Sequence, residues 1–453
     1  MRRFRVLVIA AWVVTGCAAV DQRPGGVEPG KDRFVPFTEF LNIVRSARFE
    51  DYKGRSGIRV ESPQAFEDMR THILYMYDGV KQVSSFLHDG AYADCIAMES
   101  QPSVRHLGIR KIAEPPSSSS LVGGGREREP GQVKYLDSLL KLGLKDRFGN
   151  PIACSSGTIP MQRITLETLA RFRTLRDFLS KNPVGLGRPH LDGKEPEFRP
   201  DWEATHLHAY GSQTVDNYGG NSWLNLWNPS GDFSLSQQWY TAGTGSSTQT
   251  VEGGWQVLSD KYNTGNAVLF IYWTADNYQS KGCYNLDCTG FVQTNSNWYL
   301  GGPWDHYSST GGTQWGFELQ WKLFSGNWWL FLKGPGNYEA VGYYPTSLYS
   351  GGQLAKRATS IIYGGEVARK TGDTWPQMGS GSFASGGWQH AAFQNTIFYI
   401  PRDMDDGVGV WADLTTTVES LSTCYTINYV SSASGGNWGT YFFFGGPGAT
   451  TCN

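Results

Sequence analysis

Beyond residue 204 the chain is a series of short runs in which apolar and polar residues alternate, separated by glycine-rich turns. In the run 314–324 the odd-numbered residues from Trp315 to Leu323 are all apolar, and the residues between them are Gly, Glu, Gln and Lys. This alternation is typical of a half-buried antiparallel strand and places Glu318 on its solvated face. Further strand candidates are 267–273, 327–332, 340–345, 395–400 and 439–446. Turns separate them too closely for crossover helices, so the pattern predicts an all-β sandwich or barrel.

The first part of the chain, residues 33–181, has a different composition, rich in charged residues, Leu and Ala. Apolar residues at three- and four-residue spacings predict helices over 63–83 and 166–179. The segment 182–203 carries four prolines, which exclude a helix or a central strand and predict an exposed linker. We therefore expect a smaller α/β or mainly helical N-terminal domain over 33–181, a linker over 182–203 and a β-sandwich over 204–453.

The first residues predict export. The sequence MRRF is a positive start, residues 6–14 are an apolar segment too short to span a bilayer, and 14–17 read VTGC, a bacterial lipoprotein cleavage box. The mature chain would begin at a lipidated Cys17; ordinary cleavage after Ala18 or Ala19 is the alternative. The protein is then a cell-envelope lipoprotein or a secreted protein, in contact with a membrane only through that anchor. The formal net charge of -2 gives no reason to expect nucleic acid.

Cysteine usage agrees with export, because seven cysteines without Cys17 leave six, an even number in an oxidising compartment. Proximity in the sequence favours three disulfides, although spacing alone leaves other pairings open. The expected pairs are Cys95 with Cys154, Cys283 with Cys288, and Cys424 with Cys452. Cys283 and Cys288 lack a second close pair or neighbouring histidines, so a disulfide is favoured over zinc.

Two glutamates share similar surroundings. Glu252 in TVEGGWQV and Glu366 in SIIYGGEV both lie in apolar, glycine-flanked strands, within a half of the chain that has only three other glutamates after residue 204. A carboxylate in an apolar strand is costly to bury, so two in matching surroundings suggest one site. Paired carboxylates point to acid/base chemistry.

Other catalytic groups have weaker support. His206 and His208 share one face of a strand, which is a possible two-ligand metal fragment, but no third ligand follows at a suitable spacing and a structural role is favoured. No metal site is therefore predicted. The sequence Gly379-Ser380-Gly381-Ser382 lies in a glycine-rich all-β stretch and not in the strand-turn-helix context of a serine hydrolase.

Several motifs, taken in order, resemble the neprosin family of glutamic peptidases. In the C-terminal half they are HAYGSQTVDNYGGNSWLNLWNP, SLSQQWY, VEGGWQV, FIYWTADNYQSKGCYNLDCTGFVQ, GNWWLFL, VGYYPTSL, IIYGGEV, MGSGSF and NWGTYFFFGGPG. The N-terminal half resembles that family's activation domain, with DCIAMESQPSVRH around Cys95 and CSSGTIPMQR from Cys154 as landmarks. The resemblance covers nearly the whole chain after its first residues.

The resemblance implies an antiparallel, jelly-roll-like β-sandwich peptidase without a cofactor, active at acid pH and cleaving polypeptides, including proline-rich ones, after proline. Its catalytic pair falls on Glu252 and Glu366. It also implies an N-terminal domain that covers the groove until the linker is cut. Two positions depart from the family's pattern, Gly253 and Tyr363, and both flank the supposed site.

The expected mechanism has one ionised and one protonated carboxyl group acting on a bound water. Gln256 shares a strand face with Glu252 and is a candidate for binding that water or the oxyanion, and Trp255 is a candidate for contacting substrate. A β-sandwich glycoside hydrolase also needs two carboxylates, so composition leaves it open. A non-catalytic carbohydrate- or surface-binding module is the other alternative.

Overall fold

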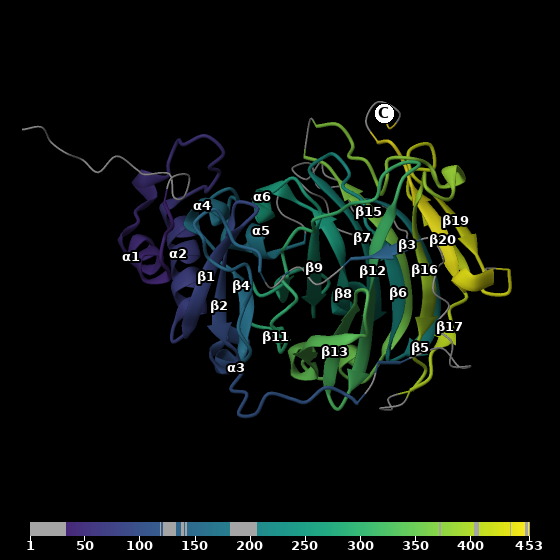
Figure 1. Ribbon diagram of the computed structural model, residues 1–453, viewed down its shortest axis with the longest axis horizontal. Helices are drawn as coiled ribbons and strands as arrows, with labels where there is room; N and C mark the ends of the chain where they lie inside the picture. The colour runs from purple at the N-terminus through teal and green to yellow at the C-terminus, as the bar shows by residue number, and fades with distance from the viewer. Residues whose placement is uncertain are drawn as a thin grey trace, which may run out of the picture. The chain divides into compact units, whose positions relative to one another are not determined.

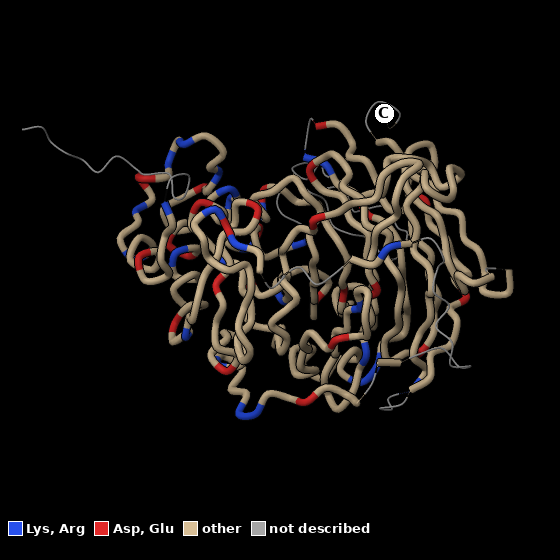
Figure 2. Tube along the Cα trace, in the orientation of Figure 1, with Lys and Arg blue, Asp and Glu red and all other residues tan. Residues whose placement is uncertain are grey.

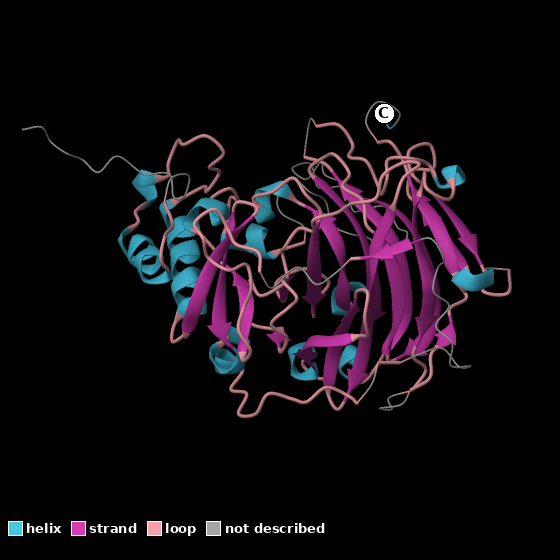
Figure 3. Ribbon diagram, viewed as in Figure 1, coloured by secondary structure: helices cyan, strands magenta, loops and turns pink. Residues whose placement is uncertain are grey.

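Two antiparallel sheets form a sandwich in this computed structural model (Figure 1; helices and strands are distinguished in Figure 3). The structure describes residues 33–117, 119–120, 133–136, 140, 143–181, 206–370, 373–402, 407–434, 436–448 and 452. The chain from Pro36 to Asn453 forms one compact unit. Within the described ranges, no helix has the length and apolar character needed to cross a bilayer.

One sheet has seven strands among the described residues, in the order β10-β9-β8-β7-β15-β5-β18, and is called the seven-stranded sheet. Its members are β5 (Leu207–Asn217), β7 (Phe233–Ala242), β8 (Gln249–Val257), β9 (Val268–Thr274), β10 (Gly282–Tyr284), β15 (Ala358–Ala368) and β18 (Thr416–Glu419). The short helix α6 (Ser259–Tyr262) joins β8 to β9.

The other sheet has ten strands among the described residues and is called the ten-stranded sheet. Eight run in the order β11-β14-β13-β12-β6-β16-β20-β19, with β17 paired to β16 and β3 paired to β12. They are β3 (Val133–Tyr135), β6 (Gly219–Asn225), β11 (Val292–Gln293), β12 (Gln314–Phe324), β13 (Asn327–Lys333), β14 (Glu339–Pro345), β16 (Ala392–Tyr399), β17 (Val410–Trp411), β19 (Thr426–Val430) and β20 (Tyr441–Gly445). Single 3-10 turns occupy Gly245–Ser247, Thr346–Tyr349, Gln353–Ala355, Ala384–Gly386 and Gly436–Trp438.

The predicted all-β sandwich is confirmed. The alternation in β12 also correctly predicted that the face with the odd-numbered residues is buried. A Cβ atom added to Gly253 of β8 would meet Leu319 and Trp321 of β12, so these two apolar residues fill the space between the sheets. The prediction for the other face of β12 is wrong. Glu318 is only 4% exposed, because the hydroxyls of Tyr135 and Tyr338 donate hydrogen bonds to its carboxylate. Both faces of this strand are therefore buried.

The N-terminal region, residues 36–181, combines helices with a small antiparallel sheet ordered β1-β2-β4. Its elements are α1 (Phe37–Ser46), α2 (Pro63–Tyr77), β1 (Gln82–His88), β2 (Ala91–Ala97), α3 (Pro102–His106), β4 (Thr158–Gln162), α4 (Leu166–Leu169), α5 (Leu175–Leu179) and 3-10 turns at Phe49–Asp51 and Met98–Ser100. Buried Arg163 pairs with Asp94 at 2.6 Å inside this region. Figure 2 shows charged residues concentrated here, while the sandwich strands are mostly uncharged.

The boundaries of two predicted helices differ from the sequence pattern. The helix expected over 63–83 ends at Tyr77, because Gly79 has a φ of +61° and the chain then enters β1. The helix expected over 166–179 is two helices, because Thr174 adopts an extended conformation and caps α5 through a reciprocal pair of hydrogen bonds with Asp177.

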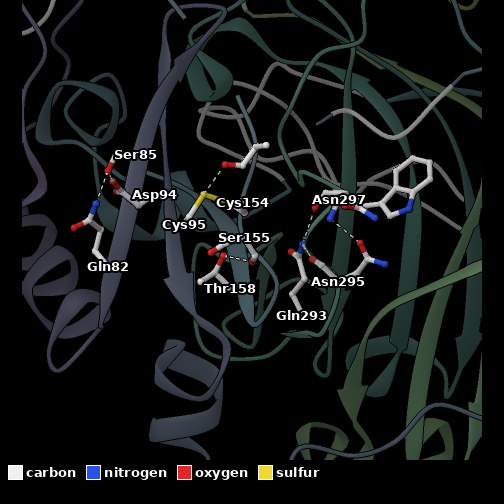
Figure 4. The surroundings of a disulfide bond; sticks show 12 residues. Gln82, Ser85, Asp94, Cys95, Cys154, Ser155, Thr158, Gln293, Asn295 and Asn297 are labelled. Atoms are coloured by element: carbon white, nitrogen blue, oxygen red, sulfur yellow. Dashed lines mark hydrogen bonds between the residues drawn. A yellow bond between two sulfur atoms is a disulfide. The ribbon is translucent and has the colours of Figure 1, made fainter. Parts of the chain in front are cut away.

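The disulfides are the three predicted pairs, Cys95–Cys154, Cys283–Cys288 and Cys424–Cys452. Figure 4 shows the first of them, which ties β2 to the segment just before β4. The predicted signal segment 1–17 with its lipidation site Cys17, and the predicted linker 182–203, lie outside the described residues. They and the domain boundaries stay predictions.

Candidate active site

Glu252 and Glu366 lie on the same face of the seven-stranded sheet, one on each side of β7. Glu252 of β8 pairs in register with Trp239 of β7, and Glu366 of β15 pairs with Leu235 of β7. Trp239 and Leu235 belong to an aromatic-rich cluster on the face that points away from the ten-stranded sheet. The two carboxylates, 114 residues apart in sequence, therefore meet across one intervening strand.

A lysine from the N-terminal region lies between the two glutamates. The ammonium nitrogen of Lys181 is 2.7 Å from Glu252 Oε2 and 3.1 Å from Glu366 Oε2, and all three side chains are 0% exposed. It also lies 5.1 Å from the centre of the Trp239 ring. Burying two carboxylates is costly without a counter-charge, and Lys181 supplies it.

The remaining partners of Glu252 are neutral hydrogen-bond donors. Tyr278 and Thr250 each donate a hydroxyl hydrogen bond to Oε1 at 2.6 Å, and Gln237 donates its amide to Oε2 at 3.0 Å. Burial, together with the nearby carboxylates, raises the pKa of Tyr278 well above its usual value, so Tyr278 stays a neutral phenol. Among the described residues, Lys181 is the one cation within ion-pair distance of Glu252.

Glu366 has a different environment, because two imidazoles lie beside it. His206 contacts Glu366 Oε1 through Nδ1, and His208 Nε2 is 3.9 Å from the same oxygen. Burial would raise the pKa of Glu366, but the Lys181 ammonium and the two histidines more than offset it and hold that pKa well below its usual range. Glu366 is therefore a carboxylate in this arrangement.

The histidine pair is thus part of the site, where the sequence favoured a purely structural role. His206 directly precedes β5 and His208 is its second residue, and His208 pairs in register with Glu366. The described residues contain no group of three or more His, Cys, Asp or Glu side chains arranged to hold a metal ion. The two imidazoles instead act on the charge of Glu366.

Contacts around α5 hold Lys181 in place. Arg176 donates hydrogen bonds to the backbone oxygens of Ser280 and Tyr278 at 2.8 and 3.2 Å. Lys261 of the sandwich donates to the backbone oxygen of Phe178 at 3.1 Å and lies 3.6 Å from the centre of its ring. The last turn of the N-terminal region is therefore fixed against the same sheet face that carries the glutamates.

Two residues proposed from the sequence as supporting groups lie elsewhere. Gln256 shares the face of Glu252, but its amide contacts the hydroxyls of Tyr284 and Tyr262 at 3.3 and 3.2 Å, so Gln237 is the amide beside Glu252. Trp255 is 0% exposed and donates its indole N–H to the backbone oxygen of Asn225, which places it in the core between the sheets.

The two departures from the family pattern also point into that core. A Cβ at Gly253 would face Leu319, and the Tyr363 hydroxyl lies 3.0 Å from that of Tyr240 and 3.2 Å from the backbone oxygen of Phe398. Gly253 directly follows Glu252, and Tyr363 lies three residues before Glu366. Because side chains alternate along a strand, an odd separation places both positions on the face opposite to the glutamates. Neither contacts the carboxylates.

Sequence reasoning missed Lys181 and Gln237. Gln237 lies on β7 between Gly254 of β8 and Gly364 of β15. A Cβ atom on Gly254 would clash with the backbone oxygen of Ser236, and one on Gly364 would clash with that of Ala209. The paired glycines beside each glutamate are therefore a signal of close backbone approach on both sides of Gln237. For Lys181 the only signal in the sequence is its position directly before the proline-rich segment. That position does not indicate that its side chain enters the site.

The family model described as Neprosin matches residues 230–447. These residues form a neprosin domain. Glu252, Glu366 and Gln237 all lie inside the neprosin domain, whereas Lys181, His206 and His208 precede the matched range. The match supports the prediction that the protein is a peptidase.

Three solved structures are similar to the chain at a distance. Scytalido-glutamic peptidase with a transition state analog inhibitor has 9% identity and a TM-score of 0.28, covering 53% of this chain and 98% of its own. SCP-B, a member of the Eqolisin family of peptidases in complex with the tripeptide Ala-Ile-His, has 8% identity and a TM-score of 0.28. The match covers 54% of this chain and 98% of SCP-B. CG-16, a homodimeric agglutinin from chicken liver, has 8% identity and a TM-score of 0.18, covering 37% and 96%. The family model is what identifies the neprosin domain.

Proposed function

We propose that this protein is a glutamic peptidase in which Glu252 and Glu366 activate water for peptide-bond hydrolysis, and that the arrangement described here is its latent form. The observation that carries the proposal is that both buried carboxylates bind one nitrogen, that of Lys181. A water molecule in the place of that nitrogen would lie within hydrogen-bond distance of both carboxyl groups, so their ionisation is coupled and the pair holds one proton at mildly acid pH.

The surroundings of the two glutamates assign their roles. Without Lys181, Glu366 keeps the imidazoles of His206 and His208, which favour its ionised form. Glu252 keeps the neutral donors Tyr278, Thr250 and Gln237. The shared proton therefore resides on Glu252, and Glu366 is the general base.

Hydrolysis then follows from these roles. The Glu366 carboxylate takes a proton from water, and the water oxygen attacks the scissile carbonyl carbon. The proton on Glu252 polarises the carbonyl oxygen, and Glu252 then delivers that proton to the leaving nitrogen as the C–N bond breaks, while Glu366 retains the proton taken from water. Gln237, beside Glu252, is placed to donate to the developing oxyanion, the role that the sequence gave to Gln256.

Latency follows from the position of Lys181, which occupies the space where water and the scissile carbonyl would bind. Activation requires cutting the chain after Lys181, in the segment 182–203, and withdrawing α5. We also propose that the protein is exported with Cys17 as a lipid-modified residue. The peptidase is further proposed to prefer cleavage after proline and to be active at acid pH. The sequence of residues 1–17 and the family resemblance support these finer points.

The test is digestion of a mixed peptide library at several pH values by the acid-treated wild type and by Glu252→Gln and Glu366→Gln variants. Both substitutions keep size and hydrogen-bonding capacity, so both variants are expected to fold and to lose proteolysis. A fully active variant of either kind would overturn the assignment. Release of sugars from polysaccharides without peptide cleavage would instead identify a glycoside hydrolase, and binding without turnover would identify a binding module.

A further inference from the structure

The ten-stranded sheet has a strand edge that its own strands leave open. On one side of β12, β13 pairs with Glu318–Phe324 but stops there, so the stretch Gln314–Gly316 has no partner from the sandwich on that side among the described residues. Strand β3 of the N-terminal region fills this edge, in a parallel register of Gln314 with Val133 and Gly316 with Tyr135. Leu136 N–H extends the ladder to the Gly316 oxygen at 2.7 Å. Adding a strand to an open edge is a general mode of peptide recognition.

Described residues that precede β3 also contact the outer face of this sheet, at separate places. We call the described residues 104–117, 119–120 and 133–136 the N-terminal strap. Val104 packs against Trp329, Phe331 and Tyr343 on β13 and β14. Further along, the backbone N–H and oxygen of Ser120 pair with the side-chain amide of Gln320 at 2.7 and 2.9 Å. Figure 1 shows the described residues after α3 running along the lower side of the view, and β3 lying beside β12.

Most of these contacts recognise backbone, but one recognises a phenol. The Tyr135 hydroxyl donates to Glu318 Oε1 at 3.0 Å, and its ring lies 5.4 Å from Lys333 Nζ. The same ring meets Trp223 of β6 edge-to-face, with centroids 6.3 Å apart. Tyr338 donates a second hydrogen bond to the Glu318 carboxylate and so orients it. A carboxylate, an ammonium and an indole therefore surround one tyrosine side chain.

We propose that this face of β12 is a second polypeptide-binding site, which accepts an extended segment with a tyrosine and is filled by the N-terminal strap in the latent form. The proposal rests on the proposed peptidase function for its use, because release of residues 36–181 would empty the site for a substrate. The site lies on the opposite outer face of the sandwich from Glu252 and Glu366. Long polypeptides would be held there while a distant part reaches the glutamates.

A polypeptide is favoured over a sugar as occupant for two reasons. The open edge of β12 offers backbone groups in strand register, which only another backbone pairs with repeatedly. The amide of Gln320 makes both its hydrogen bonds to a single peptide residue, Ser120. The expected ligand therefore shares two features with the bound strap, an extended backbone and a tyrosine side chain.

The first experiment measures binding without requiring catalysis. In the full chain carrying Glu366→Gln, the further changes Tyr135→Ala and Leu136→Pro remove the phenol and the N–H that hold β3. A fluorescent peptide with the sequence of residues 131–140 is expected to bind this chain at least about tenfold more tightly than the Glu366→Gln parent, measured by fluorescence anisotropy. Replacing the tyrosine of the peptide by phenylalanine, or Glu318→Gln in the protein, should each weaken binding about tenfold or more, because a hydrogen bond to a charged group is lost. Equal binding to parent and opened chain, or equal binding of both peptides, would overturn the proposal.

The second experiment decides the matter if the opened chain shows no cooperative thermal transition. In the acid-processed wild type, the unlabelled peptide 131–140 is expected to slow cleavage of a long, unfolded, tyrosine-containing polypeptide and to leave hydrolysis of a short peptide unchanged. Hydrolysis of both substrates with no effect of the peptide rejects the second site while the peptidase stands. Absence of hydrolysis of the short peptide rejects the peptidase. Anisotropy of the labelled peptide on the acid-treated wild type and on acid-treated Glu318→Gln then tests the site: binding about tenfold weaker to Glu318→Gln supports the proposal, and equal binding overturns it.

Discussion

The imidazole of His72 on α2 donates its Nε2–H to the backbone oxygen of Asp287 at 2.8 Å, joining the N-terminal region to the sandwich. Desolvation lowers the pKa of His72 and outweighs the opposite effect of Asp287, and the nearby Lys261 ammonium adds a smaller effect in the lowering direction. Lys261 itself is paired with the Asp287 carboxylate at 2.7 Å. The lowered pKa favours neutral His72 when the N-terminal region is packed on the sandwich, so a protonated His72 would have to lose its proton for this packing to form.

Acid is therefore expected to loosen the closed form through His72. The depressed pKa means that the open or unfolded chain binds more protons than the closed chain, so stability falls as the pH drops below the ordinary histidine value of about 6.5. A His72→Gln variant keeps a donor but cannot titrate, so its melting temperature should fall less between pH 7 and pH 5 than that of the wild type. His106→Gln is the matched control, since His106 makes a similar bond to the Tyr75 oxygen at an exposed place. Identical pH dependence in wild type and His72→Gln would exclude this role.

Carboxylates at the same interface should respond only at lower pH. Asp260 lies 2.5 Å from Arg59 and 2.8 Å from Lys370. Burial raises its pKa, but Lys370, Arg59 and Arg171 outweigh burial and bring the pKa below the usual value. Its contribution is present at neutral pH and is lost only as the pH falls through that lowered pKa.

An Asp260→Asn variant is accordingly expected to be less stable at pH 7 by under about 1 kcal/mol, because the pair is partly exposed, and indistinguishable from wild type at the acid end of a titration. Chemical denaturation at a series of pH values measures this difference. A destabilisation that persists undiminished at the lowest pH would point to packing instead of charge.

Lys181 should control latency. A Lys181→Met substitution removes the counter-charge of two buried carboxylates, a change that costs about 3–5 kcal/mol in comparable buried pairs. We expect α5 to detach from the sheet and the uncut chain to hydrolyse a short peptide, whereas the uncut wild type is expected to be inactive. Lys181→Arg keeps the charge and should stay latent. Initial rates measured before any cleavage is visible on a gel separate these cases, and an inactive uncut Lys181→Met chain would show that more than this side chain blocks the site.

The fold and the acidic pair were predictable from local patterns, whereas most of the site was not. Alternation along one strand assigned faces correctly, as for Leu319 and Glu252, because the period of two is a property of the strand itself. It could not tell which polar faces are covered, so Glu318 was expected in solvent although Tyr135, distant in sequence, buries it. In the same way, the contact of Lys181 with Glu252 depends on how two separate regions pack, and no local pattern encodes it.

His206 provides the sharpest test of the roles assigned to the glutamates. Its Nδ1 contacts the Glu366 carboxylate, and its charge is one of the influences that lower the pKa of Glu366. A His206→Gln change removes the titratable ring but keeps a polar group, so the pKa of Glu366 should rise. A general base with a raised pKa remains protonated up to a higher pH, and the acid limb of the kcat/KM profile should therefore move to higher pH.

Matched variants make this prediction decisive. His208→Gln should shift the acid limb less than His206→Gln, because His208 lies 3.9 Å from the carboxylate and does not hydrogen-bond to it. At the pH optimum of the wild type we expect His206→Gln to lose roughly tenfold in kcat/KM, with recovery at higher pH, since the base is still present. A variant that loses activity equally at every pH would mean that His206 only supports the fold of β5. An unchanged profile would mean that Glu366 is ionised without help from His206, and that the imidazole has no part in setting the base.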